Sequence, residues 1–184
     1  MMSAPGETIR SARLDLIPFT REFLRASLDG DLAEAERLLG AILPKVWPDY
    51  PTTCLLRLNQ LETDPSILPW LMRGMVLRST NRVVGHIGFH DAPGAAHLRE
   101  LSPGGAEFGY TVFGEYRRQG FAEEAAVALM HWARTEHSVT RFVVSISPEN
   151  APSLALAAKL RFRLIGSQMD EIDGPEDVFE RVSE

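Results

Sequence analysis

Residues 112–122 read VFGEYRRQGFA, and this stretch decides the fold because it joins a strand-like segment to the most regular helix of the chain. Over residues 120–136 the apolar side chains recur at the spacing of a single helix face. That face consists of Ala122, Ala125, Ala126, Leu129, Met130 and Ala133. A small residue in the turn lets a ligand approach the backbone, and the start of a helix supplies unpaired N–H donors and the positive end of its dipole. The stretch therefore predicts an anion site best matched to phosphate, with Arg117 and Arg118 adding charge. The alternative is an ordinary turn with solvated arginines.

The composition restricts the kinds of protein that can surround this site. The chain has 184 residues, of which 45% are hydrophobic and 24% charged, as in a globular protein with a core. Nineteen Lys+Arg against 25 Asp+Glu leave a net charge of −6, which argues against a general nucleic-acid binder. The single cysteine, Cys54, cannot form an internal disulfide or a cysteine zinc site. No apolar run approaches the ~20 residues of a membrane span, and no secretion signal begins the sequence. We expect a cytoplasmic protein that binds neither nucleic acid nor membrane.

Local patterns predict the remaining elements. Residues 1–7 read as a disordered lead, and residues 8–184 as one domain. Strands are expected at 14–17, 71–78, 82–90, 106–112, 141–147, 164–169 and 177–182, the last two forming a hairpin around Asp173-Gly174. Helices are expected from a cap at Thr20 to about residue 28, and over 32–39 between a cap at Asp31 and a closing Gly40. Further helices are expected at 120–136 and 152–160, with a short one near 53–61 in a proline-rich region. This order is a mixed α/β (α+β) arrangement without repeats.

A second motif lies at residues 150–162, which read NAPSLALAAKLRF. Together the two segments resemble the GNAT superfamily of acyl-CoA-dependent N-acetyltransferases. The first matches the family's pyrophosphate-binding pattern Q/R-x-x-G-x-G/A at Arg117, Gly120 and Ala122. The second resembles its closing signature N-x-x-S-x(5)-K-L-G-F at Asn150, Ser153, Lys159, Leu160 and Phe162. The segments 84–89 and 107–110 are similar to the RimJ/RimL branch, which acetylates ribosomal-protein N-termini. The resemblance covers residues 8–182.

The resemblance implies a fold and a cofactor site. The fold is a single mixed, mostly antiparallel twisted sheet of about seven strands, splayed between its fourth and fifth strands, with about four helices. Acetyl-CoA would lie in that notch, its pantetheine arm paired with the backbone of residues 110–112 and its pyrophosphate on the N–H groups of residues 118–122. Asn150 would fix the pantetheine, and Ser153 would lie near the sulfur. The implied cofactor-binding residues are Tyr110, Thr111, Val112, Arg117, Arg118, Gln119, Gly120, Phe121, Ala122, Asn150 and Ser153.

Amide formation from a thioester requires a neutral amine, which makes a general base useful. A lysine-like amine with a pKa near 10.4 is neutral about once in ~10³ molecules at pH 7, and an α-amine with a pKa near 8 roughly a tenth of the time. Glu107, on the strand expected to face the cofactor, is the candidate base, acting directly or through water. The alternative is a solvent-facing or salt-bridged glutamate, because strand parity could turn the side chain either way.

Two positions depart from the family pattern. The tyrosine that often protonates the leaving thiolate is replaced by Ala157, which leaves Ser153 as the nearest substitute, acting as a hydrogen-bond donor or relay. The alternative is that Ser153 only caps the helix. Arg161 occupies the usual glycine position, where it could strain a left-handed helix terminus.

His86 and His90 share one face of a strand but lack an evident third ligand, so we expect no metal. The sequence thus predicts an acetyl-CoA-dependent acyltransferase, an N-acetyltransferase that acts by direct attack of a primary amine in a ternary complex. The acceptor is a protein N-terminus or a small-molecule amine. The alternative is a catalytically weak acyl-CoA-binding or regulatory domain. The sequence leaves open whether the chain forms a homodimer.

Overall fold

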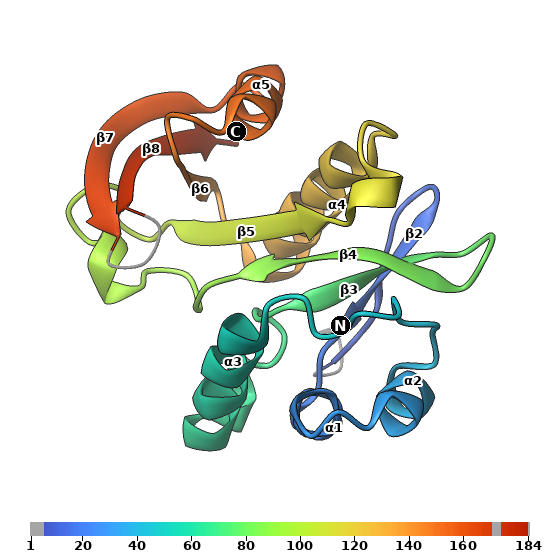
Figure 1. Cartoon of the computed structure of the whole chain (residues 1–184). Coiled ribbons are helices and arrows are strands. Elements are labelled where there is room, and N and C mark those ends of the chain that lie inside the picture. Colours follow the sequence, from blue (N-terminus) through green and yellow to red (C-terminus); the bar gives the residue numbers. More distant parts are fainter. Residues whose placement is uncertain (1–5, 171–173, 184) are drawn as a thin grey trace. The chain divides into compact units, whose positions relative to one another are not determined.

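The computed structural model describes residues 6–170 and 174–183 as a mixed arrangement of strands and helices (Figure 1). The strands are β1 (Ile9–Arg10), β2 (Leu14–Pro18), β3 (Arg73–Leu77), β4 (Arg82–Phe89), β5 (Ala106–Val112), β6 (Arg141–Ile146), β7 (Arg163–Asp170) and β8 (Gly174–Val182). The α-helices are α1 (Arg21–Leu28), α2 (Leu32–Leu39), α3 (Pro51–Thr63), α4 (Phe121–His137) and α5 (Ala151–Lys159). Three short 3-10 helices are η1 (Pro65–Ile67), η2 (Ala96–Leu98) and η3 (Gly114–Tyr116).

The strands follow the order β1-β2-β3-β4-β5-β6-β8-β7 in one sheet. The pairs β1–β2, β2–β3, β3–β4, β6–β8 and β7–β8 are antiparallel, and β5–β6 is parallel. The mixed, mostly antiparallel sheet is thereby confirmed. It has eight strands where about seven were expected, because Ile9 and Arg10 pair with β2 as a short edge strand. The described residues contain five α-helices where about four were expected.

The expected fourth and fifth strands are β5 and β6. Their parallel pairing consists of Ala106 with Phe142 and Glu107 with Val143, both near the start of β5. Since β5 has seven residues and β6 has six, most of each strand lies outside this pairing. The short pairing is in keeping with the expected splay.

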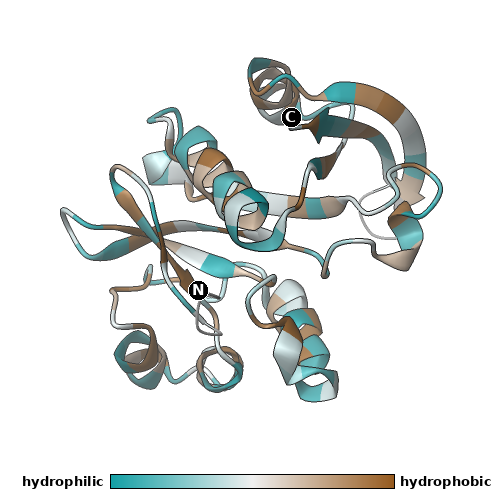
Figure 2. Ribbon diagram, turned by 180° about the vertical axis from the view of Figure 1, so that it is seen from behind, coloured by the Kyte–Doolittle hydropathy of each residue, from teal (hydrophilic) through white to brown (hydrophobic). Residues whose placement is uncertain are grey.

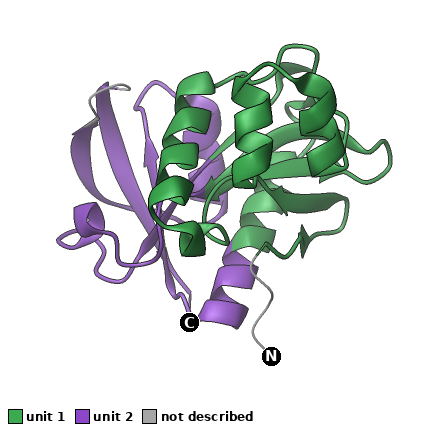
Figure 3. Cartoon of the chain, turned by 90° about the horizontal axis from the view of Figure 1, so that it is seen from below, with its two compact units in different colours: residues 1–88, 110–129 green, residues 89–109, 130–184 purple. Residues whose placement is uncertain are grey.

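The chain divides into two compact units (Figure 3). Unit 1 consists of residues 1–88 and 110–129, and unit 2 of residues 89–109 and 130–184. Strands β4 and β5 and helix α4 each contribute to both units. The single domain over residues 8–184 stays a prediction.

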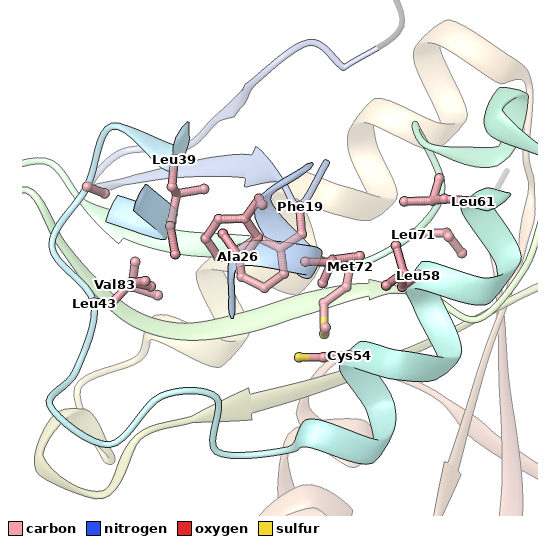
Figure 4. Close-up of a cluster of buried hydrophobic side chains, with 14 of the residues drawn as sticks. Phe19, Ala26, Leu39, Leu43, Cys54, Leu58, Leu61, Leu71, Met72 and Val83 are labelled. Carbon is pink, nitrogen blue, oxygen red and sulfur yellow. The ribbon is translucent and has the colours of Figure 1, made fainter. Parts of the chain in front are cut away.

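The core of unit 1 is formed by helices α1 to α3 and the strands beside them (Figure 4). Thr20 caps α1 by accepting a hydrogen bond from the N–H of Phe23, and Asp31 caps α2 by accepting one from Glu34. Gly40 ends α2 at a φ of +73°, as predicted from its position. Phe19, Phe23, Leu24, Leu39, Leu58, Leu71 and Met72 are among the buried residues of this core. The caps fix the ends of α1 and α2, and the buried apolar side chains of both helices belong to this cluster.

Helix α4 keeps the apolar stripe on which its prediction rested. Ala125, Ala126, Leu129 and Ala133 are fully buried, and Met130 is nearly so. The helices carry alternating hydrophobic and hydrophilic segments, as amphipathic helices do (Figure 2). In unit 2, Leu98, Val143 and Val178 form a smaller buried cluster against which Leu101 and Ile165 pack.

Several element boundaries differ from the prediction. Helix α3 is longer than expected because Pro51 occupies its first turn, where a missing N–H costs nothing. The C-terminal hairpin forms as β7 and β8, but Asp173 of the expected turn lies outside the described residues. Residues 1–5 of the expected lead also lie outside them, while the Glu7 carbonyl accepts a hydrogen bond from Arg73 Nη1 at 2.6 Å.

Candidate active site

The turn between β5 and α4 presents a row of main-chain N–H groups. Arg118 has a φ of +60° and Gly120 a φ of +82°, so the backbone is left-handed on both sides of Gln119. The N–H groups of residues 118–122 make no hydrogen bond to any other residue that the structure describes. Consecutive outward N–H groups at the start of a 17-residue helix form a concavity suited to an anion. We call residues 118–122 the N–H cradle.

Side chains hold this turn against the end of β5. Arg117 Nε donates to the Val112 carbonyl at 3.0 Å, and Gln119 Nε2 donates to the Glu115 carbonyl at 3.2 Å. The exposed Arg118 makes no ion pair within the described residues, so its guanidinium can face an anion. Arg117 therefore fixes the turn, whereas Arg118 supplies charge.

Arg13 also lies at the cradle, which no pattern in the sequence predicted. Its Nε is 2.6 Å from Glu124 Oε2, and its guanidinium carbon lies 4.5 Å from the centre of the Phe121 ring. Arg13 Nη2 would be 3.4 Å from a Cβ placed on Gly120. No local pattern points to this contact, because 111 positions separate the arginine from its glutamate.

Glu124 anchors this arrangement on the first turns of α4. It accepts hydrogen bonds from Ser11 Oγ and from the main-chain N–H of Arg13, each at 2.6 Å. Burial alone would raise the pKa of its carboxyl, but these hydrogen bonds and the Arg13 charge lower the pKa below its ordinary value. The ionised Glu124 carboxylate thus positions Arg13 through these contacts.

The last residues of β5, Tyr110, Thr111 and Val112, are partly buried and run to the same turn in unit 1. The strand approaches β4 very closely here, since a Cβ on Gly85 would lie 2.2 Å from the Thr111 carbonyl oxygen. Only glycine at position 85 allows this approach. Gly85 thus sets the position of the backbone that the sequence analysis assigned to pantetheine.

Glu107, at the start of β5 in unit 2, is 5% exposed and lies within a polar cluster. Ser145 Oγ donates to Oε1 at 2.5 Å, and His97 Nε2 lies 2.7 Å from Oε2. His90 Nδ1 is 3.7 Å from the same Oε2. Glu107 is therefore a buried, hydrogen-bonded glutamate rather than a solvent-facing one, and both of its oxygens are engaged.

Opposing effects act on the pKa of Glu107. Burial is the largest and would raise it. The hydrogen bond and charge of His90, followed by the hydrogen bonds of Ser145 and His97, outweigh burial together and lower the pKa to about 2. The group is consequently ionised across the physiological range.

The cluster extends away from Glu107 along β6, β7 and β8. Gln168 Nε2 donates to Ser145 Oγ at 3.1 Å and to Glu176 Oε2 at 3.2 Å. These contacts orient the Ser145 hydroxyl, whose single hydrogen is directed to Glu107. Ser145 and His97 were not among the residues predicted from the sequence.

The N-terminus of α5 corrects one alternative for Ser153. Asn150 is the cap residue, and its side-chain oxygen accepts a hydrogen bond from the Ser153 N–H at 3.2 Å. The alternative that Ser153 itself caps the helix is therefore wrong, because Ser153 is the third helical residue. Asn150 and Ser153 belong to unit 2, whereas residues 110–112 and the cradle belong to unit 1.

The two strand histidines have different neighbours. His86 Nε2 lies 3.7 Å from Asp49 Oδ1, and its ring packs against Tyr50 and Phe113. His90 contacts Glu107 instead. Among residues 6–170 and 174–183, no three His, Cys, Asp or Glu residues are placed to hold a metal ion.

Comparison with known proteins identifies relatives of this arrangement. Residues 13–163 match the family model described as an acetyltransferase (GNAT) domain. An uncharacterized N-acetyltransferase, p20 of Bacillus licheniformis, is 29% identical over 96 residues, which are 52% of this chain and 50% of p20. The chain spans about half the length of the curated relatives it matches.

Solved structures share the fold over nearly the whole chain. Mycobacterium smegmatis RimJ in complex with CoA-disulfide superposes with a TM-score of 0.63 at 20% identity, over 99% of this chain and 90% of RimJ. The microcin C7 self-immunity acetyltransferase MccE, in complex with acetyl-CoA and AMP, superposes with a TM-score of 0.61 at 16% identity, over 98% of both chains. No helix within the described part of the chain is long and apolar enough to cross a bilayer.

Proposed function

Because the chain belongs to the acetyltransferase (GNAT) family, we propose that it transfers the acetyl group of acetyl-CoA to a primary amine by direct attack in a ternary complex. Acetyl-CoA supplies the activated acyl group as a thioester. The protein binds and orients the two reactants, and this positioning supplies most of the rate.

The observation that carries this proposal is the N–H cradle. The N–H groups of residues 118–122 have no partner within the described residues, and the turn is left-handed at Arg118 and Gly120. Consecutive main-chain donors at the positive end of a helix dipole favour a negative charge, so an anion is a natural partner for them. A pyrophosphate fits this donor set, with Arg118 and Arg13 adjacent to it.

The remaining site residues receive roles consistent with their contacts. Tyr110, Thr111 and Val112 would pair with the pantetheine arm and polarise the thioester carbonyl through their backbone. The amide of Asn150 would hold the pantetheine, and the Ser153 hydroxyl would donate a hydrogen bond to the departing sulfur. A free thiol has a pKa near 8.5, so a strong acid at position 157 is not required.

Direct attack agrees with the state of the only cysteine. Cys54 lies buried in the core of unit 1. Burial, and to a smaller extent the charge of Asp49, raises the pKa of its thiol to about 12. A thiol with this pKa supplies almost no thiolate at neutral pH, so it is a poor nucleophile. A covalent acyl-enzyme through Cys54 is therefore not part of the proposal.

The acceptor is a primary amine on a protein N-terminus or on a small molecule. The solved structures that share this fold include both a RimJ and a self-immunity acetyltransferase. Both classes of amine must be neutral to attack, and the α-amine needs less help because a larger fraction is neutral at pH 7. We infer that an α-amine is acetylated faster than a lysine-like amine.

The test has two stages. Calorimetric titration with acetyl-CoA measures binding, and a coloured thiol reagent then measures CoA release with N-terminal peptides, a polyamine, an aminoglycoside and free amino acids. The proposal expects binding together with acceptor-dependent CoA release. Binding without release for every acceptor would support the acyl-CoA-binding domain instead. Failure to bind acetyl-CoA would overturn the proposal at the cradle.

A further inference from the structure

We propose, building on the acetyl transfer proposed above, that His97 accepts the amine proton and that Glu107 is the positioning residue that holds the His97 ring. This assignment differs from the sequence prediction, in which Glu107 itself was the base. It rests on how the two side chains are bonded and exposed in unit 2.

The surroundings of Glu107 make it a poor proton acceptor. Its side chain is 5% exposed, Oε1 accepts the hydrogen bond from Ser145, and Oε2 is in contact with His97. A proton from an amine would have to displace one of these partners. The carboxyl, with a pKa of about 2, would also hold that proton weakly at neutral pH. Glu107 is suited to accept hydrogen bonds permanently rather than to exchange a proton.

The geometry of His97 is that of an oriented base. An ionised carboxylate can only accept, so the hydrogen of the neutral imidazole lies on Nε2, which points at Glu107 Oε2 from 2.7 Å. The lone pair is then on Nδ1, which no other described residue contacts with a hydrogen bond. The His97 side chain is 46% exposed, so an amine or one bridging water can reach it. A carboxylate that fixes the tautomer of a catalytic histidine is a recurrent arrangement in enzymes.

The fold holds His97 in place through its neighbour. His97 is the middle residue of η2, and the next residue, Leu98, is buried against Val143 and Val178. The main-chain N–H of Ser102 donates to the Leu98 carbonyl at 2.8 Å and closes the turn. Leu98 thus anchors the turn in the core while His97 projects toward Glu107.

A second imidazole faces the same carboxylate. His90 Nδ1 lies 3.7 Å from Glu107 Oε2, a longer contact than that of His97, and its side chain is 40% exposed. The titratable groups that face His97 are therefore Glu107 from β5 and His90 from the end of β4, with Glu176 of β8 reached only through Ser145 and Gln168. The 2.7 Å contact of His97 to Glu107 fixes the tautomer of its ring, so we assign the base to His97 and test His90 beside it.

In the proposed step His97 is the proton acceptor and CoA is the leaving group. One proton of the ammonium form of the acceptor passes to His97 Nδ1, directly or through one water, and leaves a nitrogen lone pair. That pair forms the C–N bond to the acetyl carbonyl carbon. The C–S electron pair leaves with the sulfur as CoA thiolate, which takes up the second nitrogen proton directly or from solvent. His97 returns its proton to solvent, so the products are the acetamide, CoA thiol and one proton.

The test is the pH profile of kcat/KM for His97→Gln, which keeps an N–H donor for Glu107 but has no basic nitrogen. The acid limb of this profile is the fall of kcat/KM toward low pH. Two acceptors with different amine pKa values are used, because a limb caused by an enzyme group stays at one pH. A limb caused by the acceptor amine moves with the pKa of that amine. We expect the wild-type chain to show a limb that stays at one pH with both acceptors, and His97→Gln to lose it with a rate loss of about 100-fold or more. Acetyl-CoA affinity should stay unchanged.

Three further variants complete the experiment. His131→Gln, on the exposed surface of α4, is the matched control and should keep the limb and the rate. His97→Ala should be partly rescued by added imidazole, which a merely structural histidine would not allow. Glu107→Gln should lower the rate and shift the limb without abolishing it; if this variant fails to fold, the His97→Gln profile and the imidazole rescue decide.

The outcomes separate the two proposals. A limb that persists in His97→Gln, or that disappears in His90→Gln instead, overturns the assignment of His97 while acetyl transfer by the wild-type chain stands. Absence of transfer by the wild-type chain with every acceptor overturns both.

Discussion

The carboxyl group of Glu107 shows how one residue can couple stability to pH. Its folded-state pKa of about 2 lies below the ordinary 4.5. Because folding depresses this pKa, the ionised carboxyl contributes to stability fully above about pH 4.5. That contribution is lost as the pH falls toward 2. A difference of this size corresponds to a free energy on the order of 3 kcal/mol.

We therefore expect Glu107→Gln to unfold more easily than the wild-type chain at pH 5, and the difference in unfolding free energy to shrink as the pH falls to 3. Urea unfolding at several pH values measures this. Glu100→Gln, at an exposed position of the same unit, is the control. A difference between wild type and Glu107→Gln that stays constant from pH 5 to 3 would contradict the ionised, hydrogen-bonded state of Glu107.

Arg161 is a residue whose conformation the sequence anticipated. It follows α5 with a φ of +62°, and the turn is closed by bonds from Arg161 N–H to the Ala158 carbonyl and from Phe162 N–H to the Ala157 carbonyl. This is the Schellman arrangement, in which glycine is favoured because a side chain strains the left-handed backbone. The family-like turn is retained, with an arginine in the strained position.

Replacing this residue should relieve the strain. We expect Arg161→Gly to raise the unfolding free energy by about 0.5–1 kcal/mol, since the relief of left-handed strain exceeds the extra entropy that glycine gives the unfolded chain. Thermal or urea unfolding measures the change. Arg163→Gly, at the first residue of β7, should be destabilising and serves as the control. An unchanged or lowered stability of Arg161→Gly would show that the side chain compensates for its backbone.

Among the elements, those with local signals were predicted well. Thr20, Asp31 and Gly40 define the ends of α1 and α2 through contacts within a few residues, and the apolar stripe of α4 is a property of one segment. The proline-rich region before α3 carries turn signals and a helix start together. The predicted helix was therefore shorter than α3. The pairing of Ile9–Arg10 with β2 has no signal in a segment of two residues.

The start of α4 carries the prediction that bears most directly on function. Gly120 and Gly40 both have a positive φ, of +82° and +73°, so Ala at either position introduces a similar backbone strain. Only Gly120 belongs to the N–H cradle, and a Cβ there would lie 3.4 Å from Arg13 Nη2. We expect Gly120→Ala to weaken acetyl-CoA binding about tenfold or more, because strain turns the donors away and the methyl group blocks close approach.

Gly40→Ala is the matched control for this loss. It should lower the unfolding free energy by about 1 kcal/mol, as Gly120→Ala does, and leave acetyl-CoA affinity unchanged. Calorimetric titration of the three proteins measures affinity, and thermal unfolding measures strain. Equal acetyl-CoA affinities of Gly120→Ala and the wild-type chain would contradict binding of the pyrophosphate at the cradle.

At the scale of the whole chain, the contacts that sequence patterns could not predict are the long-range ones. Glu124 meets Arg13 across 111 positions, and Ser145 meets Glu107 across 38. Local periodicity constrains only residues within a few turns, and a single sequence contains no information on such pairs. The motifs at 117–122 and 150–162 nevertheless pointed to the two segments that we propose as parts of the cofactor site. The patterns did not predict the partners that set the orientation and pKa of the site side chains. His97 is one of these partners.

Binding of acetyl-CoA should stabilise the chain by mass action, since a ligand held by the folded backbone cannot bind the unfolded one. At a free concentration of about 100 times Kd the gain is about 2.7 kcal/mol, which for a chain of this size corresponds to a rise in Tm of roughly 5–10 °C.

Trp47 lies in unit 1 and Trp132 in unit 2, so single-tryptophan variants report each unit separately. Because β4, β5 and α4 run through both units, we expect both reporters to shift together. Gly120→Ala should show a smaller shift at the same ligand concentration. A shift confined to Trp47 would mean that the units unfold independently, and no shift at all would contradict the proposed cofactor.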